Sequence, residues 1–372
     1  MYDGRWLKPV EELYDWHYRN ERYLRNEQPL ASVAMVYSQQ TATFYGGDHA
    51  KAKVEDHTLG FYQALVEARI PFEMVHDRLL DAGHTDQFRT LILPNIAALS
   101  VEQCAQLRQF VERGGSLVAT YETSLYDEWG VRRSDFGLAD LFGLSATGPA
   151  EGPLRNSYLH IEKNQRTGEY HPLLAGLEDA GRIINGVHRI PAQPHQRGLY
   201  APLTLIPPYP DLPMEKVFPR VPKTDIPGVT ARQIGKGRVV FFPWDIDRTY
   251  WEVLSPDHGK LLRNAVVWAT DEEPVVSVQG AGLLEVTVWT QKQSLTVHLV
   301  NLSNPMMMKG PVREIIPIGT QKVRLRLPSG KKLAGVKLLV GGTQPDLSEA
   351  AGVVEVQVPS ISLHEVVAFD LA

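Results

Sequence analysis

The sequence predicts an α/β domain with a parallel sheet, followed by a smaller all-β domain. Short apolar strands alternate with amphipathic helices from Ala31 onward, which is the pattern of a parallel sheet covered on both faces. After Val275 the helical periodicity disappears, and turn-separated strands predict an antiparallel β-sandwich. At 372 residues, the chain is also long enough for two separate cores.

The first domain is predicted from a regular alternation of elements. Ser100, with Gln103 three residues later, predicts the N-cap of a helix that ends at Gly114-Gly115. Because the order is β-α-β, we expect parallel strands with right-handed crossovers. Strands are predicted at 31–38, 71–77, 89–95 and 116–120, and a further helix is predicted at 54–68.

Residues 145–227 break this alternation. They contain proline-rich stretches such as PPYPDLP and FPRVPKTDIP, which predict an insertion rather than core. Regularity returns at GVTARQIGKGRVVFFPWDID, where Gly235-Lys236-Gly237 predicts a hairpin turn between two strands. A helix at about 257–269 then closes the domain, which we place at 31–273, with the sandwich at 274–372.

The N-terminal segment, residues 1–30, is predicted to contain a separate helix at 7–27. Its apolar face is expected to include Val10, Leu13, Tyr14, His17 and Leu24. The segment is charged throughout and has no apolar run, so it predicts neither a signal peptide nor a membrane anchor. We therefore expect a cytoplasmic location.

Composition excludes several classes of function. Asp and Glu total 43 against 38 Lys and Arg, and the net charge of −5 does not provide the basic surface that nucleic acid requires. The single cysteine, Cys104, excludes intrachain disulfides and is expected to be a buried helix residue. The twelve histidines show no HExxH or comparable spacing, so neither a metal nor another cofactor is predicted.

Several segments resemble the trimerisation domain of β-galactosidases of glycoside hydrolase family 42 and their uncharacterised relatives. They are YSQQTATFYGG, RTLILPNIAALS, GGSLVATYETSLYDEWG and GRVVFFPWDIDRTYWEVLSPDHGKLLRNAVVWAT. The tail segments VHLVNLSNPMMMKGPVREIIPIG and SISLHEVVAFDL are similar to the small β-domain that follows it in that family. The domain order matches over the whole chain.

The resemblance implies a flavodoxin-like fold of the class I glutamine amidotransferase type, without the amidotransferase nucleophile. It also implies assembly into a homotrimer. In that family, a separate (β/α)₈ barrel carries both catalytic carboxylates, and such a barrel needs about 250 residues of repeated βα units. The region before the sandwich shows too few such units, so no catalytic barrel is predicted and the family's catalytic glutamates have no matching positions.

Ligands of open parallel sheets bind beyond the carboxyl ends of the strands. We therefore expect any ligand site of this chain to lie in a crevice formed by the polar residues that follow three of the strands. The alternative is a purely structural role, in which these residues cap helices or line a subunit contact. The candidates are Gln39 and Gln40; Glu122, Thr123 and Ser124; and Asp245, Asp247, Arg248 and Trp251, with His258 at the start of the next helix.

Two of these clusters could carry chemistry. Ser124, in ATYETSLYD, could be the nucleophile of a strand-to-helix turn, although the GxSxG frame is absent. Asp245 and Asp247 could be an acid/base or sugar-binding pair on an extended segment. The structural alternative is a salt bridge to Arg248 within a loop.

The expected function is that of the non-catalytic assembly part of a β-galactosidase-like glycoside hydrolase. The expected partners are further copies of the chain, a glycosidase barrel domain and carbohydrate, but not nucleic acid or a membrane. The alternative is a stand-alone esterase or amidase that uses the strand-end pocket, with Ser124, Glu122, Asp245 and His258 as catalytic candidates.

Overall fold

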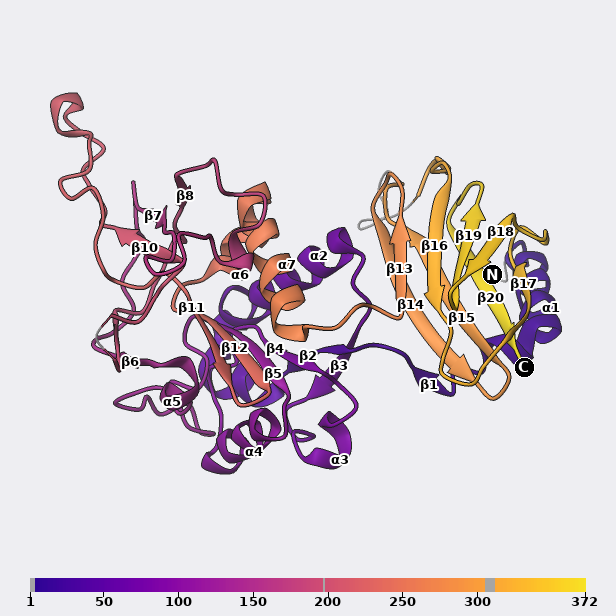
Figure 1. The fold of residues 1–372 in the computed structure, drawn as a ribbon, viewed down its shortest axis with the longest axis horizontal. Helices are drawn as coiled ribbons and strands as arrows, with labels where there is room; N and C mark the ends of the chain where they lie inside the picture. The colour runs from indigo at the N-terminus through magenta and orange to yellow at the C-terminus, as the bar shows by residue number, and fades with distance from the viewer. Residues whose placement is uncertain (1–3, 197, 305–311) are drawn as a thin grey trace. The chain divides into compact units, whose positions relative to one another are not determined.

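The computed structural model describes residues 4–196, 198–304 and 312–372. The chain divides into two compact units (Figure 1). The sandwich unit comprises residues 1–31, 66–71 and 273–372, and the α/β unit comprises residues 32–65 and 72–272. Part of the tail used for the sequence resemblance, residues 305–311, lies outside the described residues.

The α/β unit contains a six-stranded sheet with the order β11-β12-β5-β4-β2-β3. Five neighbouring strands are parallel, and β11 pairs antiparallel with β12 at one edge. Numbered along the chain, the parallel strands lie in the order 2-1-3-4-5, so the direction of strand addition reverses between β2 and β4. The strands are β2 (Val33–Tyr37), β3 (Phe72–His76), β4 (Thr90–Leu93), β5 (Ser116–Thr120), β11 (Thr230–Ile234) and β12 (Gly237–Phe242).

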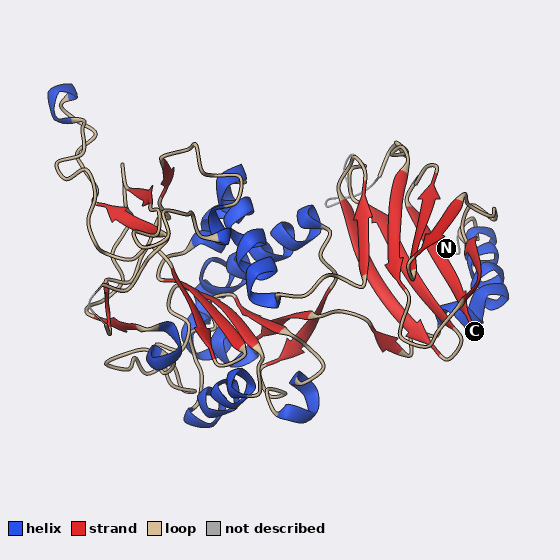
Figure 2. Cartoon of the chain, in the orientation of Figure 1, coloured by secondary structure: helices blue, strands red, loops and turns tan. Residues whose placement is uncertain are grey.

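The central strands are apolar because both of their faces are covered. All residues of β4 and β5 are buried, as expected for the middle of a parallel sheet. Figure 2 shows helices α4 (Val101–Glu112) and α7 (Pro256–Thr270) on opposite sides of this sheet. The predicted capping box of α4 is present, with Ser100 and Gln103 bonded to each other's backbone. Cys104 is buried in this helix, as predicted.

The segment after β2 differs from the prediction of a helix at 54–68. Helical turns begin already at Gln39. A π-helical turn at Thr41–Gly46, a 3₁₀ turn at Gly47–His49 and a second π-helical turn at Lys51–Glu55 precede α2 (Asp56–Ala68). The helical backbone is interrupted at Gly47, which has a positive φ of 51°. This arrangement brings the Tyr45 side chain to the polar cluster described below.

The proline-rich insertion is more ordered than the sequence predicts. It forms one three-stranded and one two-stranded antiparallel sheet, and its strands bury Leu159, Ile161, Ile183, Leu203 and Leu205. The sequence does not predict this order, because strands of three or four residues between prolines leave almost no periodic signal. The strands are β6 (Leu144–Ala146), β7 (Tyr158–Ile161), β8 (Arg182–Ile184), β9 (Ala192–Pro194) and β10 (Leu203–Ile206). Short helices complete the unit: α3 (Ala82–Thr85), α5 (Ala139–Phe142), α6 (Ile246–Val253), and 3₁₀ turns at Pro172–Leu174 and Met214–Lys216.

The sandwich unit consists of two antiparallel sheets, with the orders β1-β14-β15-β20-β17 and β13-β16-β19-β18. Its core is made by alternate residues of these strands, such as Val286, Val297 and Val356. The first sheet contains β1 (Gln28–Pro29), β14 (Leu284–Gln291), β15 (Ser294–Asn301), β20 (His364–Leu371) and β17 (Leu333–Leu338). The second contains β13 (Val276–Gln279), β16 (Gln321–Arg326), β19 (Val353–Val358) and β18 (Leu347–Ala350).

Helix α1 (Leu7–Leu24) belongs to the sandwich unit. The buried ring of Tyr23 packs with Val366 and Ala368 of β20, and the Trp16 indole donates a 2.9 Å hydrogen bond to the Leu339 carbonyl. The predicted apolar face is wrong, since Leu13 and Tyr14 are exposed. Trp16 and Tyr23 lie seven residues apart on one helix face, and both carry a polar tip that can pair with the sheet beneath. Within the described residues, no helix is long and apolar enough to cross a membrane.

Candidate functional site

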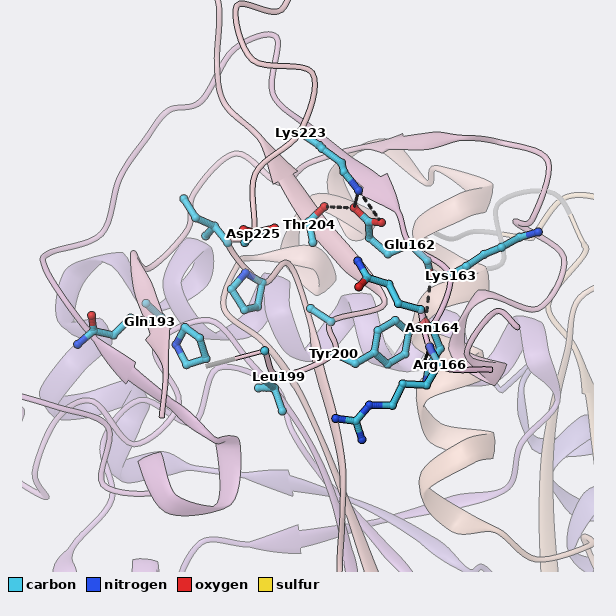
Figure 3. A pocket seen from close by; sticks show the side chains of 17 residues that line it. Glu162, Lys163, Asn164, Arg166, Gln193, Leu199, Tyr200, Thr204, Lys223 and Asp225 are labelled. Carbon is cyan, nitrogen blue, oxygen red and sulfur yellow. Dashed lines mark hydrogen bonds and ion pairs between the residues drawn. The ribbon is translucent and has the colours of Figure 1, made fainter. Parts of the chain in front are cut away.

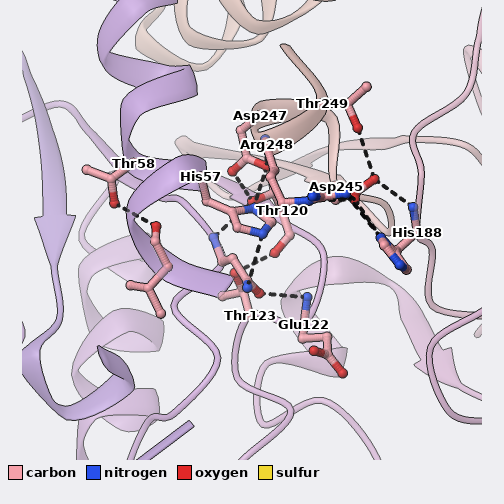
Figure 4. A network of polar contacts seen from close by, with 12 residues as sticks. His57, Thr58, Thr120, Glu122, Thr123, His188, Asp245, Asp247, Arg248 and Thr249 are labelled. Carbon is pink, nitrogen blue, oxygen red and sulfur yellow. Dashed lines mark hydrogen bonds and ion pairs between the residues drawn. The ribbon is translucent and has the colours of Figure 1, made fainter. Parts of the chain in front are cut away.

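The polar cluster predicted from the sequence lies where β5 and β12 end (Figure 4). Thr120 is the last residue of β5, and Asp245 and Asp247 follow β12 at the start of α6. The two aspartates are not on an extended segment, as was predicted, because Asp247 already lies in the first turn of the helix. Their carboxylates therefore meet different partners and do not act as a pair.

Asp247 forms a fully buried contact with His57 of α2. Its Oδ1 lies 2.7 Å from His57 Nδ1, and its Oδ2 accepts a 2.7 Å hydrogen bond from the Thr120 hydroxyl. The other ring nitrogen of His57 lies 3.4 Å from the side-chain amide of Asn95. His57 and Asp247 are at most 1% exposed, so this group links α2, β5 and α6 inside the fold.

Asp245 forms a second group with Arg248 and His188. Its Oδ2 accepts hydrogen bonds of 2.9 and 3.1 Å from the Arg248 guanidinium and lies 3.1 Å from His188 Nδ1. The salt bridge to Arg248, which the sequence analysis gave as the structural alternative, is thus present. Burial alone would raise the pKa of Asp245, but hydrogen bonds from His188 and the charge of Arg248 outweigh it and lower this pKa. Asp245 is therefore held as a carboxylate.

Glu122 forms a third group with two tyrosines. Its carboxylate accepts hydrogen bonds from the hydroxyls of Tyr45 and Tyr126, the latter at 3.0 Å. Its backbone N–H donates to the Asn95 side chain at 3.1 Å. Burial, followed by the Glu122 charge, raises the pKa of both tyrosines, so they remain protonated donors. Glu122 is only 6% exposed, which leaves its oxygens little access to a ligand.

Ser124 and Thr123 lie inside the turn that follows β5. Ser124 has a positive φ of 66°, is fully buried, and its hydroxyl accepts a 3.1 Å hydrogen bond from the backbone N–H of Leu138. Thr123 is also fully buried and donates to the Thr120 carbonyl at 2.7 Å. No base is hydrogen-bonded to the Ser124 hydroxyl within the part of the chain that the structure describes. The turn thus has the sharpness of a nucleophile elbow without an exposed nucleophile.

His258 and Trp251 contribute from the two helices that follow β12. His258 is fully buried, its Nε2 lies 2.8 Å from the Ile184 carbonyl, and its ring packs edge-on against Trp244. Burial lowers the pKa of His258, so the ring is neutral. Trp251 is half-buried on α6.

The glutamine cluster does not join the other two clusters, contrary to the prediction. Strand β4 lies between β5 and β2, so the three clusters do not follow neighbouring strands. Gln39 is exposed, and the Gln40 side chain donates to the Ala98 carbonyl and to Gln103. Tyr45, six residues after Gln39, is the residue of this segment that reaches Glu122.

The arrangement has little capacity for chemistry. The carboxylates of Glu122, Asp245 and Asp247 are buried and occupied by neighbouring side chains. The side chain of His188 is 34% exposed and is oriented by Asp245, so solvent reaches it. However, none of the described serine, threonine or cysteine side chains is hydrogen-bonded to it. The described residues also contain no group of three or more His, Cys, Asp or Glu arranged to hold a metal ion.

Sequence reasoning missed the residues that complete the three groups. His57, Asn95, Tyr45 and His188 each come from a different segment, and His57 is 190 positions from Asp247 in the chain. His188 stood among the scattered histidines and has no local motif. The strand-end rule could have indicated Asn95 alone, because it lies two residues after the end of β4.

The fold of this chain is found within several proteins of known structure, and part of the chain matches a family model. The model of the β-galactosidase trimerisation domain matches residues 31–146. The structure of α-L-fucosidase isoenzyme 2 from Paenibacillus thiaminolyticus is similar, with a TM-score of 0.70 and 18% identity over 96% of this chain and 51% of that chain. A family 42 β-galactosidase from G. stearothermophilus has a TM-score of 0.56 at 19% identity, over 91% of this chain and 40% of its own. The β-galactosidase from Bacillus circulans sp. alkalophilus has a TM-score of 0.56 at 12% identity, over 91% of this chain and 41% of that chain.

At these identities, the solved structures establish a shared fold and no more. The chain spans about half of the fucosidase and about two fifths of the β-galactosidases. The match to the family model is independent of them and includes β2, β4 and β5 with the Ser124 turn. The resemblance predicted from the sequence is therefore confirmed: residues 31–146 match the model of the β-galactosidase trimerisation domain.

Proposed function

We propose that this chain is a non-catalytic assembly module of a β-galactosidase-like glycoside hydrolase and that it forms a homotrimer. The match of residues 31–146 to a trimerisation domain carries this proposal. A head-to-tail contact repeated around a threefold axis closes into a ring, which leaves no unsatisfied contact surface. The module would support a glycosidase barrel domain, which is the partner that the sequence resemblance implies.

The strand order supports a flavodoxin-like, amidotransferase-like fold for the α/β unit. The parallel strands run 2-1-3-4-5, which is the order of flavodoxin-like sheets. In such folds a ligand binds at the reversal point, here between β2 and β4. That position is filled by internal contacts, since the Ser38 hydroxyl donates to Asp77 at 2.6 Å and Gln103 donates to the Asp77 carbonyl at 2.8 Å.

The bonding of the three buried carboxylates supports the non-catalytic part of the proposal. A retaining glycosidase needs two carboxyl groups about 5 Å apart and an inverting one needs them roughly 6.5–9.5 Å apart, both open to the sugar. Here Asp245 and Asp247 are fully buried and Glu122 nearly so, and each is occupied by a histidine, an arginine or tyrosines. The ester or amide hydrolase alternative receives no comparable support, because the Ser124 hydroxyl is buried.

Multi-angle light scattering of the purified chain tests the assembly. We expect a single species of about three times the chain mass of 41.6 kDa that persists on dilution through the micromolar range. A monomer over that range would contradict the proposal.

A further inference from the structure

The insertion contains a pocket with a volume of about 740 Å³, and its lining includes no residue of the strand-end cluster (Figure 3). This volume lies within the roughly 300–1,000 Å³ typical of small-molecule sites. Its walls come from the turn after β7, from β9 and the chain beyond it, from β10, and from residues 223–227. All of these segments belong to the α/β unit.

At one end of the pocket, the carboxylate of Glu162 is fixed by hydrogen bonds from neighbouring side chains. Glu162 accepts hydrogen bonds from the Thr204 hydroxyl at 2.9 Å and from the Lys223 ammonium at 2.9 and 3.0 Å. The Tyr200 hydroxyl donates to the Glu162 carbonyl at 2.9 Å, which fixes the ring of Tyr200 in the wall. This end is therefore preorganised, and the charge of Lys223 is neutralised by its partner.

Other polar groups of the pocket are not occupied. Within the described residues, the side chains of Arg166, Gln193 and Asp225 have no hydrogen bond or ion pair, and all three are exposed. Together they supply a guanidinium donor, an amide that both donates and accepts, and a carboxylate acceptor. This is the opposite of the strand-end cluster, where neighbouring side chains occupy the carboxylates.

The charge balance and the apolar surfaces narrow the class of ligand. The ammonium of Lys163, which also lines the pocket, lies over the ring of Tyr170. The charges of Asp225 and Arg166 are opposite, so these two groups and Gln193 fit a neutral ligand with several donors and acceptors. Tyr200, Leu199 and the pyrrolidine rings of Pro194 and Pro227 add apolar surface between these polar groups. Figure 3 shows the Tyr200 ring beside Arg166, with Gln193 beyond Leu199.

We propose that this pocket binds a neutral oligosaccharide, with Tyr200 against a sugar face and Arg166, Gln193 and Asp225 bonded to hydroxyls. A sugar ring presents apolar C–H faces and a rim of hydroxyls, which is the combination that this lining offers. The pocket is thus a carbohydrate site on the assembly module, separate from any catalytic centre. The inference does not rest on trimer formation, because every lining residue comes from one chain.

Saturation-transfer NMR and calorimetry on the full chain test this site. The probes are neutral disaccharides and tetrasaccharides of gluco, galacto and manno configuration with α and β linkages. A sulfated disaccharide and an uncharged peptide of similar size serve as competitors of other chemistry. We expect saturable binding of at least one neutral oligosaccharide and none of the competitors.

Paired variants locate the binding. Arg166→Gln and Asp225→Asn should each weaken binding about three- to tenfold, because each removes a hydrogen bond from a charged group. Arg220→Gln and Asp211→Asn are the matched controls, since both residues lie in the insertion but do not line the pocket, and they should leave binding unchanged. Thermal melting of all four variants checks that each is folded.

Three outcomes would overturn the proposal. They are the absence of binding across the neutral panel, binding of only the sulfated sugar or the peptide, and sugar binding that is unaffected by Arg166→Gln and Asp225→Asn. A trimer that binds no sugar would refute this inference and leave the assembly proposal intact. A monomer that binds sugar would do the reverse.

Discussion

The strand-end cluster and the insertion pocket are both rich in polar side chains, but they differ in how those side chains are bonded. In the cluster, Asp245 and Asp247 are fully buried, and their oxygens are occupied by His188, Arg248, His57 and Thr120. In the pocket, the exposed side chains of Arg166 and Asp225 are not bonded within the described residues. Polar groups that are already paired hold a fold together, whereas unpaired groups around a cavity remain available to a ligand.

The largest expected effect is on stability, from Asp247→Ala. This change leaves the buried His57 ring and the Thr120 hydroxyl without their partner, and losing one member of a buried pair costs about 3–5 kcal/mol. Urea unfolding should show the loss. Asp225→Ala in the pocket is the matched control and should change the free energy of unfolding by less than about 0.5 kcal/mol, because that side chain is exposed. If both changes lowered the free energy of unfolding equally, the strand-end cluster would not stabilise the fold more than the pocket does.

A smaller effect is expected from pH through His171, whose ring lies beside Tyr200 of the pocket and Trp268. Burial and then the charge of Arg238 lower the pKa of His171 to about 4, against about 6.5 in the unfolded chain. The unfolded state therefore binds the proton first as the pH falls. The stability from this group is complete above about pH 6.5 and is lost as the pH falls toward 4.

Urea unfolding of wild type and His171→Asn at pH 7.5 and 5 measures this contribution. We expect the wild type to lose about 2 kcal/mol more than the variant on acidification. The same change at the exposed His17 is the control. If His171→Asn kept the full pH dependence of the wild type, the ring would not be shielded from solvent as described.

The smallest expected effect comes from Tyr126→Phe, which removes one of the two tyrosine hydroxyls on Glu122. Tyr45 still donates to this carboxylate, so the loss should be near 1 kcal/mol, typical of one hydrogen bond. Tyr18→Phe is the matched control, because its ring is 79% exposed. A gain in stability in Tyr126→Phe would show that Glu122 is strained by its partners and held for another purpose.

The fold was largely predictable because its signals are local. The capping box at Ser100 and the apolar runs of β4 and β5 are complete within a few residues. The face on which α1 packs was not predictable, since the choice of Trp16 and Tyr23 over Leu13 depends on where the sheet offers a carbonyl and an aspartate. Periodicity identifies a helix face but does not reveal what lies opposite.

The candidate site was predictable only in half of its members. Strand-end position and the Asp-x-Asp spacing are enough to identify Asp245, Asp247 and Glu122 from the sequence. Their partners His57 and His188 come from distant segments, so no spacing in the sequence could pair them with these carboxylates. The pocket was missed for a similar reason, because its lining is assembled from short segments of the insertion that carry no periodic pattern.

We propose that the strand-end groups hold the fold together and do no catalysis. The decisive assay is turnover of aryl β-galactosides and aryl esters by the repurified chain. We expect no hydrolysis above the uncatalysed rate for either class of substrate. The proposal would be contradicted by turnover that persists through repurification and falls by several powers of ten in Ser124→Ala or Asp245→Ala while the variant remains folded.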